Sequence, residues 1–299
     1  MNFPGSFRTA SARPMVWLFA LMLFISGPVV ADEGDPIIVS APSRSEGTLK
    51  QQVSQFSRQV ADITGQEQFA RRGSTYCPRI IGLPDPYHRI ILTKLEHAAK
   101  ATRKVRAGPA GCQPDLFVIF TSDSAGLLKQ IQLGNPGFVR RLQSDAKARQ
   151  LHARAPVKWW YDTALIGADG EPVIDGATYR TNASLISSGI AITLASIVVI
   201  VDVGLSDGYP LDSIASYVAM IAFAQIQVSA GRLAKAPSIL GIFDRVSPRL
   251  DALRELTVWD RAYLRALYRI PPDRPLWRQR ARLNAAMVEA IMEAERADQ

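Results

Sequence analysis

The hydrophobic pattern of this chain is organised around one long stretch that carries almost no charge. Residues 190–203 read IAITLASIVVIVDV and are dense in β-branched side chains, which predicts a strand covered on both faces. At about 3.3 Å per residue this strand would be longer than usual. We therefore expect a break or bulge near Ala195 and Ser196.

A second apolar stretch follows the turn GLSDGYP. Residues 212–228 contain no charged side chain after Asp212, and a helix that is apolar on all sides must be buried. Asp212 or Ser213 is expected to cap its first free N–H groups. The two stretches together predict a central buried strand that leads into a central buried helix.

The rest of the pattern predicts flanking helices and further strands. The helix that starts at Pro86 is expected to turn Ile91 and Leu95 inward and Lys94 outward. Thr257 and Asp260 form a capping box that opens an amphipathic helix. Helices are predicted at 49–63, 86–105, 124–133, 138–153, 257–270 and 276–297, and strands at 115–121 and 157–163.

These elements predict an α+β (mixed α/β) fold, with a central sheet, flanking helices, a buried central helix and a helical C-terminus. Residues 46–299 are expected to form a single globular domain, with a possible sub-boundary near residue 153.

The first 31 residues have the three parts of a secretory signal. Arg8 and Arg13 are the positive region, 15–25 the apolar core, and the small residues up to Ala31 the cleavage site. Since Ser26 interrupts the apolar run before the roughly 20 residues that a membrane span needs, we expect cleavage after Ala31. The mature protein is then periplasmic or secreted, without a stable transmembrane segment, and begins with a mobile linker at 32–45.

Charge points to an acidic partner. The chain has 35 Lys+Arg and 27 Asp+Glu, and removal of the signal takes two arginines, which leaves 33 − 27, or +6. A basic exported protein is attracted to acidic envelope components or to an acidic protein partner. Export makes nucleic acid a poor partner.

The two cysteines, Cys77 and Cys112, have 34 residues between them. In an oxidising compartment a lone pair is most simply a disulfide. A redox or metal-binding pair would need CxxC spacing or a nearby cluster of histidines, and the sequence shows neither.

No complete catalytic, metal or cofactor motif is found, so none is predicted. A zinc peptidase carries HExxH on a helix, but this chain has no histidine after His152. On that motif the central helix would offer Ile221 and Gln225 as ligands and Ala222 as the base, which cannot hold zinc.

Two aspartates remain as candidates for chemistry. Asp202 closes the central strand and Asp123 follows the strand at 115–121, and open α/β sheets build their sites at the carboxyl ends of strands. Neighbouring strands would let this acidic pair share a cleft. The alternative, which we favour, is that each aspartate caps a helix or turn.

Arg261, Arg265 and Arg269 line the outer face of the helix at 257–270. Such a stripe is usually a solvated face, but a guanidinium also binds phosphate or carboxylate through a two-pronged set of donors. These three arginines are therefore candidate anion contacts.

Several segments carry a resemblance to known proteins: 77–83, 115–121, VIVD at 199–202, SYVAMIAFAQ at 216–225, PSILGIF at 237–243 and LTVWDRAYLRALY at 256–268. Together they resemble a family of uncharacterised exported proteins of proteobacteria, especially alphaproteobacteria. This resemblance implies export and a shared fold without a known activity. The order of a helix ending in Gln, a SILGIF loop and an LT…DR…LY helix is also similar to zincin-like folds that have lost their metal site.

Two classes of function follow. We favour a non-catalytic protein that binds an acidic envelope partner, because a basic surface needs no exact geometry. The alternatives are a hydrolase that uses the paired aspartates, or a degenerate peptidase-like enzyme.

Overall fold

The computed structural model of this protein describes residues 45–61, 67–135, 151–167, 170–173, 184, 187–227, 236–244 and 253–297. The predicted signal, most of the linker and most of the helix at 138–153 lie outside them. The helices are α1 Glu46–Val60, α2 Asp85–Thr102, α3 Ser124–Gly134, α6 Leu211–Phe223, the 3-10 turn η2 Ile239–Gly241, α7 Val258–Arg269 and α8 Leu276–Ala297. The strands are β1 Thr75–Tyr76, β2 Pro78–Ile81, β3 Arg106–Ala107, β4 Leu116–Thr121, β5 Val157–Gly167 and β6 Ile190–Asp202.

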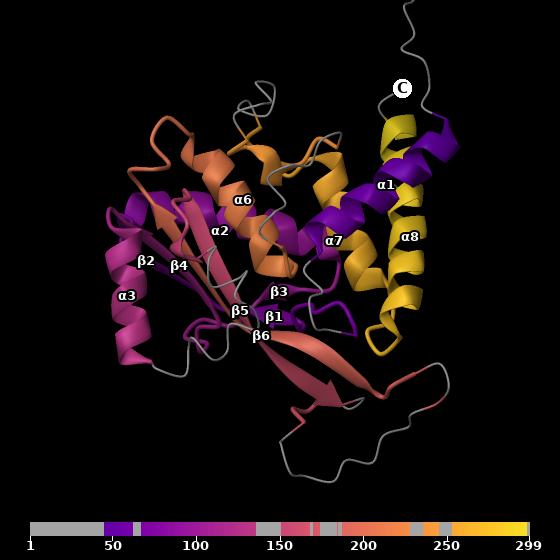
Figure 1. Ribbon diagram of the computed structural model, residues 1–299, viewed down its shortest axis with the longest axis horizontal. Coiled ribbons are helices and arrows are strands. Elements are labelled where there is room, and N and C mark those ends of the chain that lie inside the picture. Colours follow the sequence, from indigo (N-terminus) through magenta and orange to yellow (C-terminus); the bar gives the residue numbers. More distant parts are fainter. Residues whose placement is uncertain are drawn as a thin grey trace, which may run out of the picture. The chain divides into compact units, whose positions relative to one another are not determined.

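A four-stranded sheet in the order β2-β4-β6-β5 forms the centre of the unit 44–299 (Figure 1). β2, β4 and β6 are parallel, and β5 pairs antiparallel with β6. The expected bulge in the long strand is confirmed. Asp162 lies opposite Ser196 and Thr163 opposite Leu194, so that Ala195 has no partner residue on β5.

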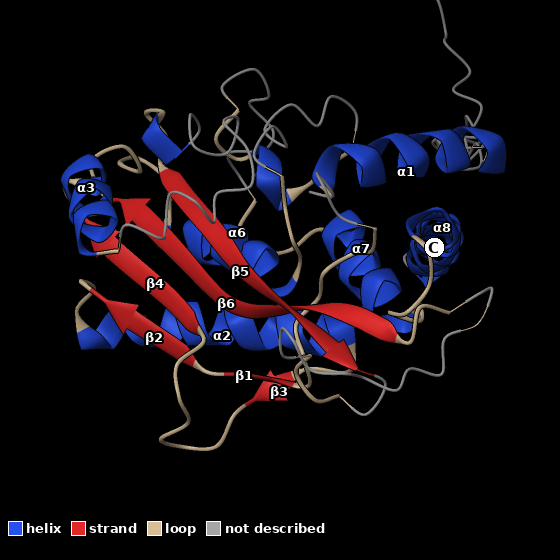
Figure 2. Ribbon diagram, turned by 60° about the horizontal axis from the view of Figure 1, so that its bottom comes forward, coloured by secondary structure: helices blue, strands red, loops and turns tan. Residues whose placement is uncertain are grey.

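Helices cover the sheet on both faces, which confirms the α+β class. Val118 of β4 and Trp159 of β5 belong to the main core, and α2 and α6 lie against this face (Figure 2). Trp160 points the other way, as alternation along a strand requires, and packs against Leu128 of α3 and Leu151.

Helix α6 is buried from Ser213 to Phe223, as its composition predicts. Its predicted cap is wrong: Pro210 is the N-cap residue and supplies no side-chain hydrogen bond. Asp212 pairs with Lys94 at 3.0 Å, and the Ser213 hydroxyl donates to Leu253 O at 2.5 Å. Among the described segments, no helix combines the length and the apolar composition that crossing a membrane requires.

The predicted disulfide is present, with the Cα atoms of Cys77 and Cys112 6.0 Å apart. It joins the β1–β2 junction to the loop before β4. The same junction is held by Asp115, which accepts from Cys77 N–H at 2.9 Å and pairs with buried Arg72 at 2.7 Å. The edge of the sheet is thereby tied to the core.

The capping box at the start of α7 is confirmed, and it extends further than the sequence suggests. The Asp260 side chain is completely buried. It accepts from Thr257 N–H and Ile239 N–H, both at 2.9 Å, and from the hydroxyls of Thr257 and Ser238 at 2.9 and 2.5 Å. One carboxylate therefore joins α7 to the η2 segment.

We predict that Asp260→Ala lowers the free energy of unfolding by about 3 kcal/mol or more, because each buried donor left without an acceptor costs about 1–3 kcal/mol. Urea denaturation of the disulfide-intact protein measures this loss. Asp207→Ala, at an exposed turn, is the matched control and should change stability by less than about 0.5 kcal/mol. Equal effects of the two substitutions would contradict the role of Asp260.

Lys94 corrects the sequence analysis, which placed it on the outer face of its helix. Its side chain is only 7% exposed and reaches Asp212 of α6 and Glu255 before α7. Burial alone would lower the pKa of Lys94, but hydrogen bonds to Glu255 and Asp212 outweigh it and raise the pKa above its ordinary value. The ammonium group thus connects three parts of the core in its charged form.

A pKa that is higher in the folded state gives stability that is present below the unfolded pKa and lost as pH rises through the folded one. We therefore expect Lys94→Met to lower stability by about 1–2 kcal/mol at pH 7, since its partners are half exposed and keep some solvation. This difference from the wild type should shrink above about pH 10.4.

Denaturation of both proteins at pH 7 and above the unfolded pKa tests this expectation. Lys50→Met is the control, because Lys50 pairs with Glu46 at 2.6 Å on the exposed face of α1, where such pairs contribute about 0–1 kcal/mol. A Lys94→Met effect that does not change with pH would show that the lysine acts through its aliphatic chain alone.

Candidate anion-binding groove

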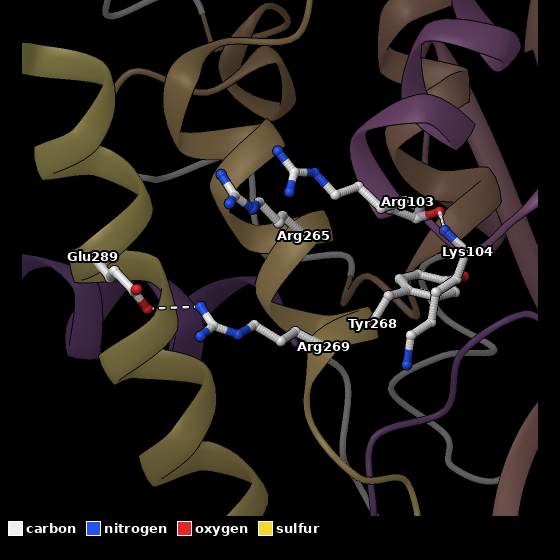
Figure 3. Close-up of a pocket in the computed structure, with 7 residues that line it drawn as sticks. Arg103, Lys104, Arg265, Tyr268, Arg269 and Glu289 are labelled. Carbon is white, nitrogen blue, oxygen red and sulfur yellow. Dashed lines mark hydrogen bonds and ion pairs between the residues drawn. The ribbon is translucent and has the colours of Figure 1, made fainter. Parts of the chain in front are cut away.

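A groove runs between the C-terminal end of α2 and the outer faces of α7 and α8 (Figure 3). It consists of two adjoining cavities of about 420 and 270 Å³, which share Arg103 and Arg265. The larger is lined by Thr102, Arg103, Lys104, Arg265, Tyr268, Arg269 and Glu289, and the smaller by Lys100, Ala101, Arg103, Val258, Arg261, Ala262, Arg265, Ala290 and Ala294.

The lining of the groove is strongly cationic. Its described residues include six basic side chains and one acid, Glu289, which gives these residues a formal charge of +5. The basic residues come from two walls, Lys100, Arg103 and Lys104 at the end of α2, and Arg261, Arg265 and Arg269 on α7. The three candidate arginines of the sequence analysis therefore lie together in one wall.

Two of these three arginines are already paired with carboxylates of α8. Arg269 donates to Glu289 at 2.6 Å and Arg265 to Glu293 at 3.2 Å. These two pairs show that α7 and α8 run antiparallel. In the same register the α8 residue opposite Arg261 is Ala297, which has no carboxylate. Arg261 instead donates to the carbonyl of Leu256.

The α2 wall is the part of the groove that the sequence analysis did not identify. Arg103 and Lys104 are both exposed, and within the described residues no ion pair or side-chain hydrogen bond is formed by either. They follow the last turn of a helix, where the helix dipole favours cations. The periodicity of this helix gives no sign that its end meets α7.

Arg103 adopts an unusual backbone conformation. Its φ is 60°, the single positive φ of a non-glycine residue in the described chain, and its N–H donates to Lys100 O at 3.1 Å. Glycine is the usual residue at such a left-handed helix end, because a side chain there costs roughly 1–2 kcal/mol. The Thr102 hydroxyl holds the turn by accepting from Val105 N–H at 3.0 Å.

The guanidinium groups of Arg103 and Arg265 are directed into the same space, whereas Arg269 turns toward Glu289 (Figure 3). Like charges that approach one another are destabilising unless an anion lies between them. Tyr268 contributes only a ring to the floor, since it is 2% exposed and its hydroxyl donates to Phe223 O and accepts from Arg72 N–H. The groove can therefore bind an anion through its rim.

The candidate aspartates lie at neighbouring strand ends, because Thr121 of β4 is paired with Asp202 of β6. Asp123 caps α3 by accepting from Gly126 N–H at 2.8 Å. A Cβ at Gly126 would lie 2.1 Å from the Asp123 carboxylate, so glycine is required for this cap.

Asp202 accepts from Leu205 N–H at 3.1 Å and from Ser124 N–H at 3.4 Å. Burial alone would raise the pKa of Asp202, but hydrogen bonds from the Ser124 side chain and from the backbone N–H groups of Leu205, Ser124 and Gly204 outweigh burial and lower it. Each aspartate thus satisfies backbone groups, which is the favoured alternative of the sequence analysis. This arrangement gives a hydrolase with paired aspartates no support.

The structure also shows where the residues that were compared with the zinc motif lie. The central helix ends at Phe223, so Gln225 lies beyond it in extended backbone and is buried, a correction to the predicted end of the helix. In the described part of the chain, no group of three or more His, Cys, Asp or Glu side chains is arranged to hold a metal ion.

Comparisons with protein-family models, with curated proteins and with solved structures found no match. The interpretation of the groove therefore rests on its geometry and charge.

Proposed function

We propose that this protein is an exported, non-catalytic binding protein that recognises an acidic envelope partner through the groove between α2, α7 and α8. The observation that carries this proposal is the concentration of six cations and one acid around two adjoining cavities. Guanidinium groups suit carboxylate and phosphate because they offer paired donors.

Export is part of the same proposal. Its support is the signal-like pattern at 1–31 together with a disulfide between the only two cysteines, since disulfides persist in oxidising compartments. The resemblance to exported proteobacterial proteins and to zincin-like folds without metal stays a prediction.

The ion pairs within the groove determine which basic residues can be substituted to test binding without disturbing the fold. Arg265 and Arg269 also hold α8 against α7 through Glu293 and Glu289, so their reversal would disturb packing as well as binding. Arg103 and Lys104 have no such structural partner in the described chain. Substitutions of these two residues therefore separate binding from folding, whereas Lys100 of the same wall pairs with Glu96 at 2.8 Å.

We predict that Arg103→Gly weakens binding of polyphosphate, alginate and polyglutamate by about 10-fold or more at low salt, a loss of roughly 1.4 kcal/mol. Glycine suits the left-handed conformation, so stability should be unchanged or higher. Titration of each polyanion by calorimetry measures binding, and urea denaturation measures stability. Affinity of the wild type should fall steeply toward about 150 mM salt.

Arg79→Ala is the matched control, because it removes one exposed arginine from the edge strand β2, outside the groove lining. It should keep wild-type affinity. Glu289→Gln should strengthen binding, since it takes the formal lining charge from +5 to +6 and frees Arg269. Absence of binding to all three polyanions, or equal losses for Arg103→Gly and Arg79→Ala, would refute the proposed function.

A further inference from the structure

The two cationic walls of the groove face each other across a space that is open along α7. Arg261 and Arg269 are eight residues apart on one helix, which is about 12 Å at a rise of 1.5 Å per residue. Arg103 lies in the opposite wall and contributes to both cavities. A ligand that occupies the whole groove therefore needs negative charge on two sides and over about this length.

The protein itself shows that polypeptide carboxylates bind to arginines of this groove. Glu289 and Glu293 of α8 present polypeptide carboxylates to Arg269 and Arg265. Arg103, Lys104 and Arg261 have no carboxylate partner in the described chain. One of these carboxylates, Glu289, lines the groove, and three lining cations are left for carboxylates of a partner.

The lining also favours a polypeptide over a glycan. Among the described lining residues, Tyr268 is the single aromatic one and is 2% exposed, so this part of the lining offers no exposed aromatic face on which a sugar ring could stack. Ala101, Ala262, Ala290 and Ala294 lie along the smaller cavity. These small side chains allow a backbone to approach closely.

We infer that the groove binds an acidic polypeptide segment in extended conformation, with consecutive Asp or Glu residues that contact the α2 wall and the α7 wall in turn. Side chains of an extended chain point alternately to opposite sides, so a run of acidic residues reaches both walls. At about 3.3 Å per residue, a length of about 12 Å takes about four residues. The inference rests on the proposed function and names its partner class.

Two peptides of equal charge test this inference on the full mature protein. One carries four consecutive Glu residues between neutral flanks, and the other carries four Glu residues separated by pairs of Gln. Fluorescence anisotropy at low salt measures both. The consecutive peptide should bind about 10-fold more tightly or better, because the spaced charges extend beyond the groove, and equal charge removes the non-specific electrostatic difference.

Protein variants test the two walls separately. Arg103→Gly and Arg261→Gln should each reduce the preference for the consecutive peptide by about 5-fold or more, whereas Arg79→Ala should leave it unchanged. Equal affinity for the two peptides, or a preference that survives both groove variants, would overturn the inference.

Alginate and vesicles with anionic lipid are the competing partners. Tight binding of either one to the groove, without binding of the consecutive peptide, would overturn the polypeptide assignment and leave the proposed function standing. Failure of every anionic probe would overturn both. The two proposals therefore fail in different ways.

Discussion

The end of a buried helix imposes the constraint on which this fold depends. The last carbonyl groups of α6 lie in the core, where a polar group without a partner is costly. Side chains from three distant parts of the chain donate to them, and this fixes the position of α6 against the sheet and against α7. The donors are Arg72 Nε to Ala222 O at 3.2 Å, the Tyr268 hydroxyl to Phe223 O at 2.8 Å, and the Tyr161 hydroxyl to Ala224 O at 2.9 Å and Ile221 O at 3.2 Å.

The neighbouring Arg71 satisfies a carbonyl group at the end of α7 in the same way. It donates to Ile270 O at 2.6 Å, at the C-terminal end of that helix, where a positive charge opposes the negative end of the dipole. Burial lowers the pKa of Arg71 to about 10, so the side chain is still charged at neutral pH. Two consecutive arginines thus hold the ends of two helices. Tyr268 joins the last turn of α7 to the end of α6. Its ring also lines the groove between α7 and the end of α2, so one side chain contributes to both the core and the groove.

Local sequence patterns predicted much of this structure. β-branched density identified β6, and the unusual length of that run indicated the bulge near Ala195 and Ser196. The capping box located the start of α7, whose three arginines were expected on its outer face. Local patterns failed where a distant partner decides the outcome. Lys94 is buried because two carboxylates far along the chain reach it, and α6 ends early because the Tyr161 and Tyr268 hydroxyls take its carbonyls. The α2 wall could not be predicted for the same reason, because Arg103 becomes part of a groove only where the end of α2 lies beside α7.

Some basic residues of the groove are paired with carboxylates and others are not. This difference explains how such a groove can exist in a stable protein. Cations gathered along one surface repel each other and reduce stability. Arg265 and Arg269 offset this repulsion through Glu293 and Glu289, and in doing so they join α7 to α8. Arg103 instead adds both charge and a strained backbone, with no ion pair in the described chain to compensate. Such residues are retained at binding sites more often than elsewhere, because the strain is useful only when a ligand uses the side chain. Arg265 and Arg269 therefore carry charge that also holds the fold together, whereas Arg103, Lys104 and Arg261 are the lining cations that have no carboxylate partner in the described chain.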